Sequence, residues 1–170
     1  TTLMRCALGL LACDGNTSIL GIDVRREPER ALADVAYIPK VAPPLDAAVS
    51  DLVRTACRLR GRPTRRVAEI AGELGLEYER VARARLRDLS GGSKQKILAA
   101  IALAADTRIL MADEPTASLD TQARHAFFAL VAARPADAVL VLCSHRTGEI
   151  RQLVNRVVEL PSPTGTYSYI

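Results

Sequence analysis

Apolar residues gather in short unbroken runs along this chain, and polar or turn-forming residues end each run. The clearest runs cover residues 109–112, 138–143 and 34–38. Because such runs are typical of strands buried on both faces, they predict a parallel sheet. Mixed Thr, Ser, Ile and Leu over 16–22 predicts a further short strand, and residues 156–160 predict a closing one.

Between these runs the apolar positions recur at helical spacing, every third or fourth residue. The helical pattern between the predicted strands at 34–38 and 109–112 is the longest, and Gly, Arg and Pro at 61–63 break it in two. Helices are predicted over residues 1–11, over both parts of 46–88, after Ser90 to about 104, over 121–134 and over 147–154.

This alternation of strands and helices predicts an α/β protein with a doubly wound, mostly parallel sheet. A chain of 170 residues fits one domain with a full hydrophobic core. Within it we expect a core from residues 1–42 and 106–160 and a helical subdomain over about 43–105. Residues 161–170 have lost the periodic pattern and are expected to form an irregular tail.

Two carboxylates, Asp113 and Glu114, follow the 109–112 run directly, and Pro115 then stops the strand. Open α/β sheets bind ligands at this end of their strands. One carboxylate can hold Mg²⁺ beside a phosphate, and the other can accept a proton from an attacking water. The alternative is that the Asp-Glu-Pro triplet only ends a strand and begins a turn.

Ser90, Gly91 and Gly92 stand before a helix-forming segment. Ser is a favoured helix N-cap, and glycines let a ligand approach the backbone closely. Free amides and the helix dipole make such an end an anion site. The alternative is an ordinary capped helix whose glycines only make a turn.

Taken in order, these segments resemble the ATP-binding cassette (ABC) ATPase family, which has a P-loop NTPase-like fold. Residues 89–95, Leu-Ser-Gly-Gly-Ser-Lys-Gln, match the signature motif, and residues 109–113 with Glu114 match the Walker B strand and catalytic glutamate. Residues 118–120 match the D-loop, and His145 matches the switch histidine.

The resemblance implies that two cassettes pair head to tail and that each closes ATP against its partner's signature. Ser90, Gly91 and Gly92 would therefore contact the opposite subunit's nucleotide, and Asp120 would report closure. A second ABC ATPase domain and a transmembrane permease are the partners it implies, with ATP and Mg²⁺ as cofactors.

For the chain's own site, the resemblance implies that Asp113 holds Mg²⁺ through water. Glu114 would polarise the attacking water, and His145 would steady the γ-phosphate. Thr1 occupies the position of a hydroxyl ligand to Mg²⁺ just after the family's phosphate-loop lysine, and Thr2 follows it.

No Gly-x-x-x-x-Gly-Lys phosphate loop occurs in this sequence, because none of its three lysines follows a glycine. The chain looks cut one residue after the Walker A lysine, so we expect residues 1–170 to bind ATP weakly or not at all.

Lys40 stands where the family has its Q-loop glutamine. It would pair with phosphate or repel Mg²⁺, or it is simply a solvent-exposed charge.

Composition limits the other functions. The net charge of +4 is mild, and the arginines concentrated between residues 54 and 87 are interspersed with Glu and Asp. A mixed-sign helical surface usually faces water, which disfavours nucleic acid as a partner.

Cys6, Cys13, Cys57 and Cys143 lack metal-ligand spacing, so we expect reduced, mostly buried thiols and no zinc site.

The longest apolar run is much shorter than the roughly 20 residues of a membrane span. Any membrane work would therefore be done through a partner, and the resemblance implies a cytoplasmic protein that lies on the inner face of the membrane through its permease. Two alternatives stay open: a soluble non-transport ABC ATPase that acts on nucleic acid or the ribosome, and a degenerate, non-catalytic pairing module.

Overall fold

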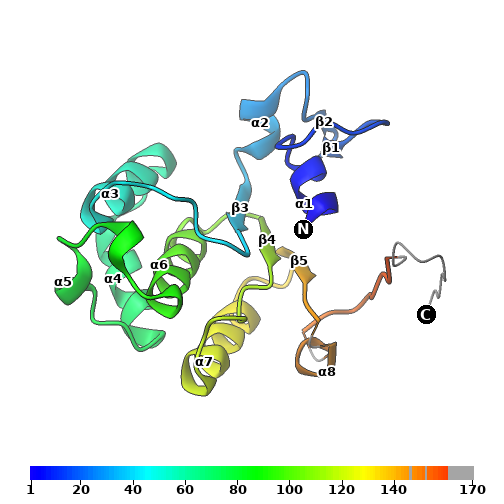
Figure 1. Ribbon diagram of the computed structural model, residues 1–170. Helices are drawn as coiled ribbons and strands as arrows, with labels where there is room; N and C mark the ends of the chain where they lie inside the picture. Colours follow the sequence, from blue (N-terminus) through cyan, green and yellow to red (C-terminus); the bar gives the residue numbers. More distant parts are fainter. Residues whose placement is uncertain (146, 152, 161–170) are drawn as a thin grey trace.

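A three-stranded parallel sheet forms the centre of the computed structural model (Figure 1). The order is β3 (Val35–Ile38), β4 (Ile109–Asp113) and β5 (Val139–Cys143), with all neighbours parallel. The α/β class and the three apolar-run strands are thereby confirmed. The structure describes residues 1–145, 147–151 and 153–160.

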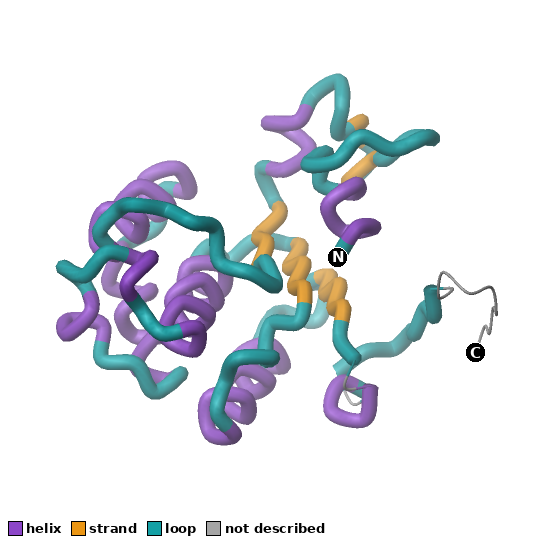
Figure 2. The backbone as a smooth tube through the Cα atoms, in the orientation of Figure 1, coloured by secondary structure: helices purple, strands orange, loops and turns teal. Residues whose placement is uncertain are grey.

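Helices connect and cover these strands (Figure 2). Before β3 come α1 (Thr2–Ala7), a hairpin of β1 (Ser18–Ile19) and β2 (Ile22–Asp23), and α2 (Pro28–Leu32). Between β3 and β4 come α3 (Val49–Arg60), α4 (Thr64–Glu73), α5 (Tyr78–Val81), the 3₁₀ turn η1 (Leu86–Asp88) and α6 (Gly91–Ala104). After β4 come α7 (Thr121–Ala132), then β5, then α8 (Thr147–Ile150).

The two faces of the sheet bury alternate residues of β4, as the pleat requires. On one face, Met111 packs with Val35 of β3 and with Met4 and Leu8 of the α1 segment. On the other face, Leu110 belongs to the large core cluster that α6 and α7 complete. The sheet is therefore covered on both sides near β3 and β4, which explains the unbroken apolar run.

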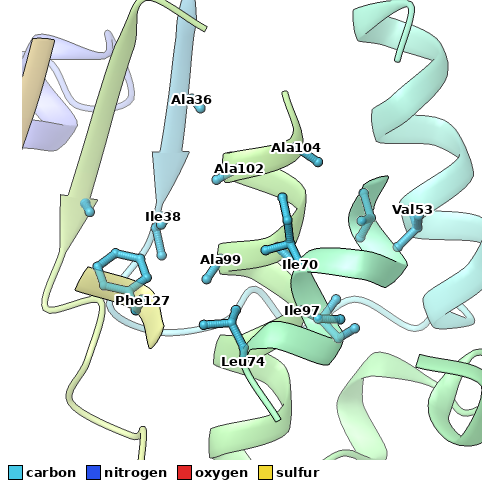
Figure 3. Packing of buried hydrophobic residues seen from close by; sticks show 14 of the residues in the cluster. Ala36, Ile38, Val53, Ile70, Leu74, Ile97, Ala99, Ala102, Ala104 and Phe127 are labelled. Carbon is cyan, nitrogen blue, oxygen red and sulfur yellow. The ribbon is translucent and has the colours of Figure 1, made fainter. Parts of the chain in front are cut away.

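The large core cluster continues from the sheet into the helices between β3 and β4 (Figure 3). Ala99 and Ala100 of α6 are fully buried, and such small side chains let α6 approach both the sheet and α4 closely. Figure 3 shows Ile70 and Leu74 of α4 beside α6, with Phe127 of α7 near Ile38.

The break over 61–63 forms as predicted. Gly61 has a left-handed backbone, φ 61°, and ends α3 there. Pro63 precedes the first residue of α4, where a missing amide hydrogen costs nothing. The two helices can thus fold back on one another and bury Val53, Cys57 and Val67 between them and their neighbours.

Three sequence predictions about secondary structure are wrong. The single strand over 16–22 is instead two short antiparallel strands, because Leu20 and Gly21 both have positive φ and turn the chain. Residues 156–160 belong to no strand, and Val157, Val158 and Leu160 in that segment are exposed. The last helix covers only Thr147–Ile150, and the expected tail over 161–170 lies outside the described residues.

The expectation that the cysteines are mostly buried is also wrong. All four thiols are free, but only Cys57 is buried, whereas Cys6, Cys13 and Cys143 are partly exposed. The apolar character of cysteine predicted burial without regard to neighbours: Cys6 lies in α1, Cys13 in the segment after it, and Cys143 beside the smaller cluster of Met4, Leu8, Val35 and Met111.

Substitution of Phe127 tests the packing of α7 against the sheet. Its ring is fully buried in the large cluster, so Phe127→Ala should lower the free energy of unfolding by about 3–5 kcal/mol. Urea denaturation measures this change. Leu59→Ala, at an 81% exposed position, is the matched control and should change it by less than about 0.5 kcal/mol. Equal losses in both variants would contradict the assigned core.

Candidate functional site at the carboxyl end of β4

Asp113 and Glu114 lie at the carboxyl end of β4, where the pairing with β5 continues past the strand. Asp113 pairs in register with Cys143, and the amide of Glu114 donates to the carbonyl oxygen of Cys143 at 2.8 Å. Glu114 has φ 48°, a left-handed conformation that is costly for a non-glycine residue. Such strain collects at functional sites, because the surrounding structure must hold it in place.

Glu114 and His145 meet directly. The backbone amide of His145 donates to Oε1 of Glu114 at 3.0 Å, and Nε2 of His145 lies 3.3 Å from the same oxygen. The Glu114 side chain is 9% exposed and that of His145 is 87% exposed. A nearly buried carboxylate is therefore oriented by a group that reaches into solvent at the edge of the site.

Asp113 is the most unusual member of the site. Its side chain is fully buried, and neither carboxylate oxygen has a hydrogen-bond partner. The nearest opposite charge is the amino nitrogen of Thr1, 3.6 Å from Oδ1. Burying a carboxylate that accepts no hydrogen bond costs several kcal/mol, so these oxygens fit a site that a hard cation such as Mg²⁺ completes.

Thr1 reaches this position because α1 lies on the same face of the sheet as Asp113. The N-terminal nitrogen is also 3.8 Å from Sγ of Cys143, at the end of the neighbouring strand. Thr2, the first residue of α1, is exposed. The structure therefore brings Thr1, Asp113, Glu114 and His145 together around one end of the sheet.

Tyr37 is a neighbour of the site that sequence reasoning missed. Burial raises the pKa of its phenol, and the negative charge of Asp113 raises it further. Tyr37 pairs with Met111 in the sheet, and Asp113 lies two residues beyond Met111, on the same face. The period-two alternation of β3 and β4 is the signal that could have found it.

Ser90, Gly91 and Gly92 form the start of α6. Ser90 caps the helix, because its Oγ accepts from the amide of Ser93 at 3.2 Å. Ser90 and Gly91 are exposed, so the first amides of a 14-residue helix face solvent. A β-carbon added to Gly92 would lie only 2.9 Å from the carbonyl oxygen of Ser118, so this glycine permits a close backbone contact.

The Asp120 carboxylate both caps α7 and forms an ion pair with Lys96. Its Oδ1 accepts from the amide of Ala123 at 2.8 Å and caps α7, and its Oδ2 lies 2.9 Å from Nζ of Lys96. The hydrogen bond from Ala123, followed by that from Lys96, lowers the pKa of the Asp120 carboxyl below its ordinary value. The expected N-cap and an ion pair that sequence reasoning missed therefore coexist.

Lys96 is itself mostly buried, with a side chain that is 12% exposed, and it also donates to the carbonyl oxygen of Gly75 at 3.4 Å. It joins α6 to the end of α4 and to the start of α7. No pattern in the sequence indicates this role, because Lys96, Gly75 and Asp120 are far apart along the chain and meet only in the folded protein.

Lys40 is exposed in the segment that follows β3 and Pro39. Gln95 of α6 is buried, and its Nε2 donates to the carbonyl oxygen of Pro39 at 3.4 Å. The helix that begins at Ser90 is therefore fixed to the backbone next to Lys40. Within the part of the chain that the structure describes, no recorded contact joins Ser90, Gly91 or Gly92 to the acidic pair.

An apolar cavity of about 360 Å³ lies between α1, β3, α3 and α6, away from this site. Leu8, Val35, Cys57 and Ala104 contribute to its walls. Val35 begins β3, whereas Asp113 ends the neighbouring parallel strand, so the cavity lies at the opposite end of the sheet from the acidic pair.

The described residues include no group of three or more His, Cys, Asp and Glu side chains that could hold a metal ion. A cation at Asp113 would therefore need most of its ligands from phosphate oxygens and water, which is usual for Mg²⁺.

Among the residues that the structure describes, no helix combines the length and the apolar character that crossing a bilayer requires.

The sequence pattern that describes ABC transporters matches residues 1–117, more than half of the chain. This chain belongs to the ABC transporter family of ATP-binding domains. The Nod factor export ATP-binding protein I of Rhizobium etli is 31% identical over 168 residues, which cover 94% of this chain and 52% of that protein.

The high-affinity zinc uptake system ATP-binding protein ZnuC of Bacillus subtilis is 28% identical over 176 residues, covering 94% of this chain and 73% of ZnuC. A solved ATP binding subunit of an ABC transporter superposes with a TM-score of 0.79 at 25% identity, covering 89% of this chain and 65% of that one. This ABC chain spans about half the length of the Nod factor export proteins it matches.

Gly92 can be tested against its neighbour. Gly92→Ala places a methyl group 2.9 Å from a backbone oxygen, so either α6 or the 118–120 segment must shift. We expect a loss of about 1–3 kcal/mol in the free energy of unfolding, measured by urea denaturation. Gly91→Ala, whose nearest contact would be 3.9 Å away, is the matched control and should cost less. A larger loss at Gly91 would contradict the described packing.

Asp113→Asn should stabilise the protein without ligand. The variant removes a buried charge that has no hydrogen-bond partner, at similar side-chain volume. We expect the free energy of unfolding to rise by about 1 kcal/mol, which thermal and urea unfolding can detect. Glu114→Gln is the control and should lower it, because the hydrogen bond that the charged Glu114 carboxylate accepts from the His145 amide is stronger than one to a neutral amide oxygen. Destabilisation by Asp113→Asn would contradict this and would show that the ion pair with the Thr1 amino nitrogen, 3.6 Å away, outweighs the cost of burying the charge.

Proposed function

We propose that this chain forms the ATP-hydrolysing part of an ABC transporter's ATPase subunit, in which ATP-driven closure of two cassettes drives a membrane permease. One observation supports this most strongly. Glu114 accepts a hydrogen bond from His145 and directly follows Asp113, whose buried oxygens have no hydrogen-bond partner, at the carboxyl end of parallel strands. Ligands of open α/β sheets bind at that end.

Each residue has a proposed task. Asp113 holds Mg²⁺ through water, and the Thr1 hydroxyl is a further ligand. Glu114 takes a proton from the attacking water, and His145 steadies the terminal phosphate and keeps the carboxylate aimed. Bound Mg²⁺ supplies positive charge that neutralises the phosphates in the reaction.

The start of α6 is proposed to act on a partner's nucleotide. Ser90 and Gly91 are exposed, and the free amides and dipole of α6 favour an anion there. Gly92 would let that phosphate come close to the backbone, and Asp120 in the adjoining segment would respond to closure. Lys40 and Thr2 are proposed to lie at the edge of the nucleotide site.

The organisation proposed for the chain is a core over 1–42 and 106–160, with the helices of about 43–105 inserted between β3 and β4. The second ABC ATPase domain would face the start of α6, and a permease would anchor the protein at the cytoplasmic face of the membrane. The printed names of the relatives include both export and uptake, so the proposal assigns neither direction nor substrate.

The arginine-rich helices favour solvent over nucleic acid, because many of these arginines already have acidic partners. Arg54 pairs with Asp51 at 3.1 Å, and Arg87 pairs with Asp46 at 2.8 Å. The pairing-module alternative has one specific observation in its favour, since Lys40 stands in the Q-loop position. Direct nucleotide binding separates it from a hydrolysing domain.

The test extends the chain at Thr1 by a strand and a Gly-x-x-x-x-Gly-Lys loop. The outer edge of β5 pairs with no strand among the described residues, and Val139 and Val141 are exposed there, so an added strand has an edge to join. We expect the extended chain to bind Mg-ATP near micromolar Kd, about 8 kcal/mol, and residues 1–170 to bind far more weakly. Isothermal titration calorimetry measures both.

Within the extended chain, Glu114→Gln should reduce hydrolysis at least about 100-fold while Mg-ATP binding persists. A matched surface change, Glu79→Gln, should leave both unchanged. Tight Mg-ATP binding by residues 1–170 alone, or full hydrolysis in the Glu114→Gln variant, would overturn the proposal. Failure of the extended chain to bind Mg-ATP would favour the pairing module.

A further inference from the structure

Cys6 and Cys13 are brought together by a reversal of the chain after α1. Gly9 has φ 69°, and the amides of Leu10 and Leu11 both donate to the carbonyl oxygen of Arg5, at 2.8 and 3.3 Å. The segment beyond α1 therefore folds back along the helix instead of leading away from it. Cys13 lies in this returning segment, two residues beyond Leu11, whose amide bonds to Arg5, the neighbour of Cys6 in α1.

The two thiols interact directly. Burial raises the pKa of Cys6, and the hydrogen bond between its thiol and that of Cys13 raises it further. Arg25 fixes the second thiol in place, since its Nη2 donates to the carbonyl oxygen of Cys13 and lies 3.5 Å from Sγ. Arg25 is in turn held through its own amide, which donates to Asp23 at 2.8 Å.

The other cysteines do not share these properties. Cys57 is 5% exposed and belongs to the apolar core, where no other described cysteine is a member of its cluster. Cys143 ends β5 beside Thr1 and belongs to the candidate site. Cys6 and Cys13 are both partly exposed, so reagents in solution can reach them.

We propose that Cys6 and Cys13 form a dithiol that closes reversibly to an intramolecular disulfide on meeting a two-electron oxidant of the peroxide class. One thiolate attacks a peroxide oxygen, the O–O bond breaks, and water leaves after proton transfer, which yields a sulfenic acid. The other thiol attacks that sulfur and releases a second water. Two thiol hydrogens and two electrons pass to the peroxide, and a dithiol reductant reverses the change.

The disulfide would tie α1 to the segment that leads into β1. α1 packs on the sheet through Met4, and its first end lies beside Asp113. The oxidised form would thus fasten an element that borders the candidate site. The inference uses only the geometry of Cys6, Cys13 and Arg25, so it does not rest on the proposed function.

Tryptic peptide mapping after peroxide treatment tests it on residues 1–170. Cys6 and Cys13 share the peptide 6–25, whereas Cys57 lies in 55–58 and Cys143 in 125–146. After hydrogen peroxide and then iodoacetamide, we expect peptide 6–25 to lose two hydrogens and to carry no alkyl group. Peptides 55–58 and 125–146 should remain alkylated, and dithiothreitol before alkylation should restore both sites in 6–25.

Single variants separate the pair from general thiol oxidation. Cys6→Ser and Cys13→Ser should each abolish the internal disulfide, whereas Cys143→Ser should retain it. Circular dichroism confirms that each variant is folded. Full alkylation of both thiols in 6–25 after peroxide treatment that oxidises glutathione would overturn the proposal. Cross-links from Cys6 or Cys13 to Cys57 or Cys143, or stable sulfinic acids at either residue, would also overturn it.

Discussion

The amide of Glu114 donates to the carbonyl oxygen of Cys143 one residue past the end of β4, and the proposed chemistry depends on this continued pairing. It carries the β4–β5 register beyond Asp113 and brings the residues after both strands side by side. His145 can then bond Glu114 through its own amide. A one-residue slip of β5 would turn Asp113 and Cys143 to opposite faces and separate the pair.

The site that results is held at a cost to stability. Asp113 is buried without a hydrogen-bond partner, and Glu114 has a left-handed backbone. Both features are expensive unless the surrounding structure enforces them, and here the fully buried core beneath β4 does so. A second set of contacts fixes the helices over the sheet: Gly92 against Ser118, and Lys96 against Asp120. A displacement of α6 would therefore also displace the start of α7, because these two contacts join them.

The sequence predicts the three strands of the parallel sheet well, because each contains an unbroken apolar run; the burial it predicts holds for β3 and β4 but not for β5, where Val139 and Val141 are exposed. The N-caps at Ser90 and Asp120 are also readable, since one side-chain oxygen and a helix-forming segment define them. The hairpin at Leu20 and Gly21 is harder, because a left-handed leucine breaks no compositional rule. Residues 156–160 have the composition of a strand, but a strand also needs an edge to pair with.

The contacts between distant segments are what sequence reasoning misses. Nothing local to Lys96, Tyr37 or Gln95 indicates a partner, because each partner lies on another element. The cysteines show the same limit, since their apolar character predicts burial and only the chain reversal after α1 brings Cys6 to Cys13. Pairwise chemistry of this kind becomes visible only when the topology is known.

The most direct test of the central claim, that the Asp113 carboxylate holds a cation at the end of the sheet where Glu114 and His145 also lie, uses paramagnetic broadening by Mn²⁺ in place of Mg²⁺. The chain has only two histidines, and both His145 and His125 are exposed, so His125 is a built-in control. The imidazole proton resonances, assigned with a His125→Gln variant, are followed by NMR as Mn²⁺ is added. The account predicts that the His145 signal broadens first and that Asp113→Asn weakens the effect; equal broadening of both histidines, or earlier broadening of His125, would contradict it.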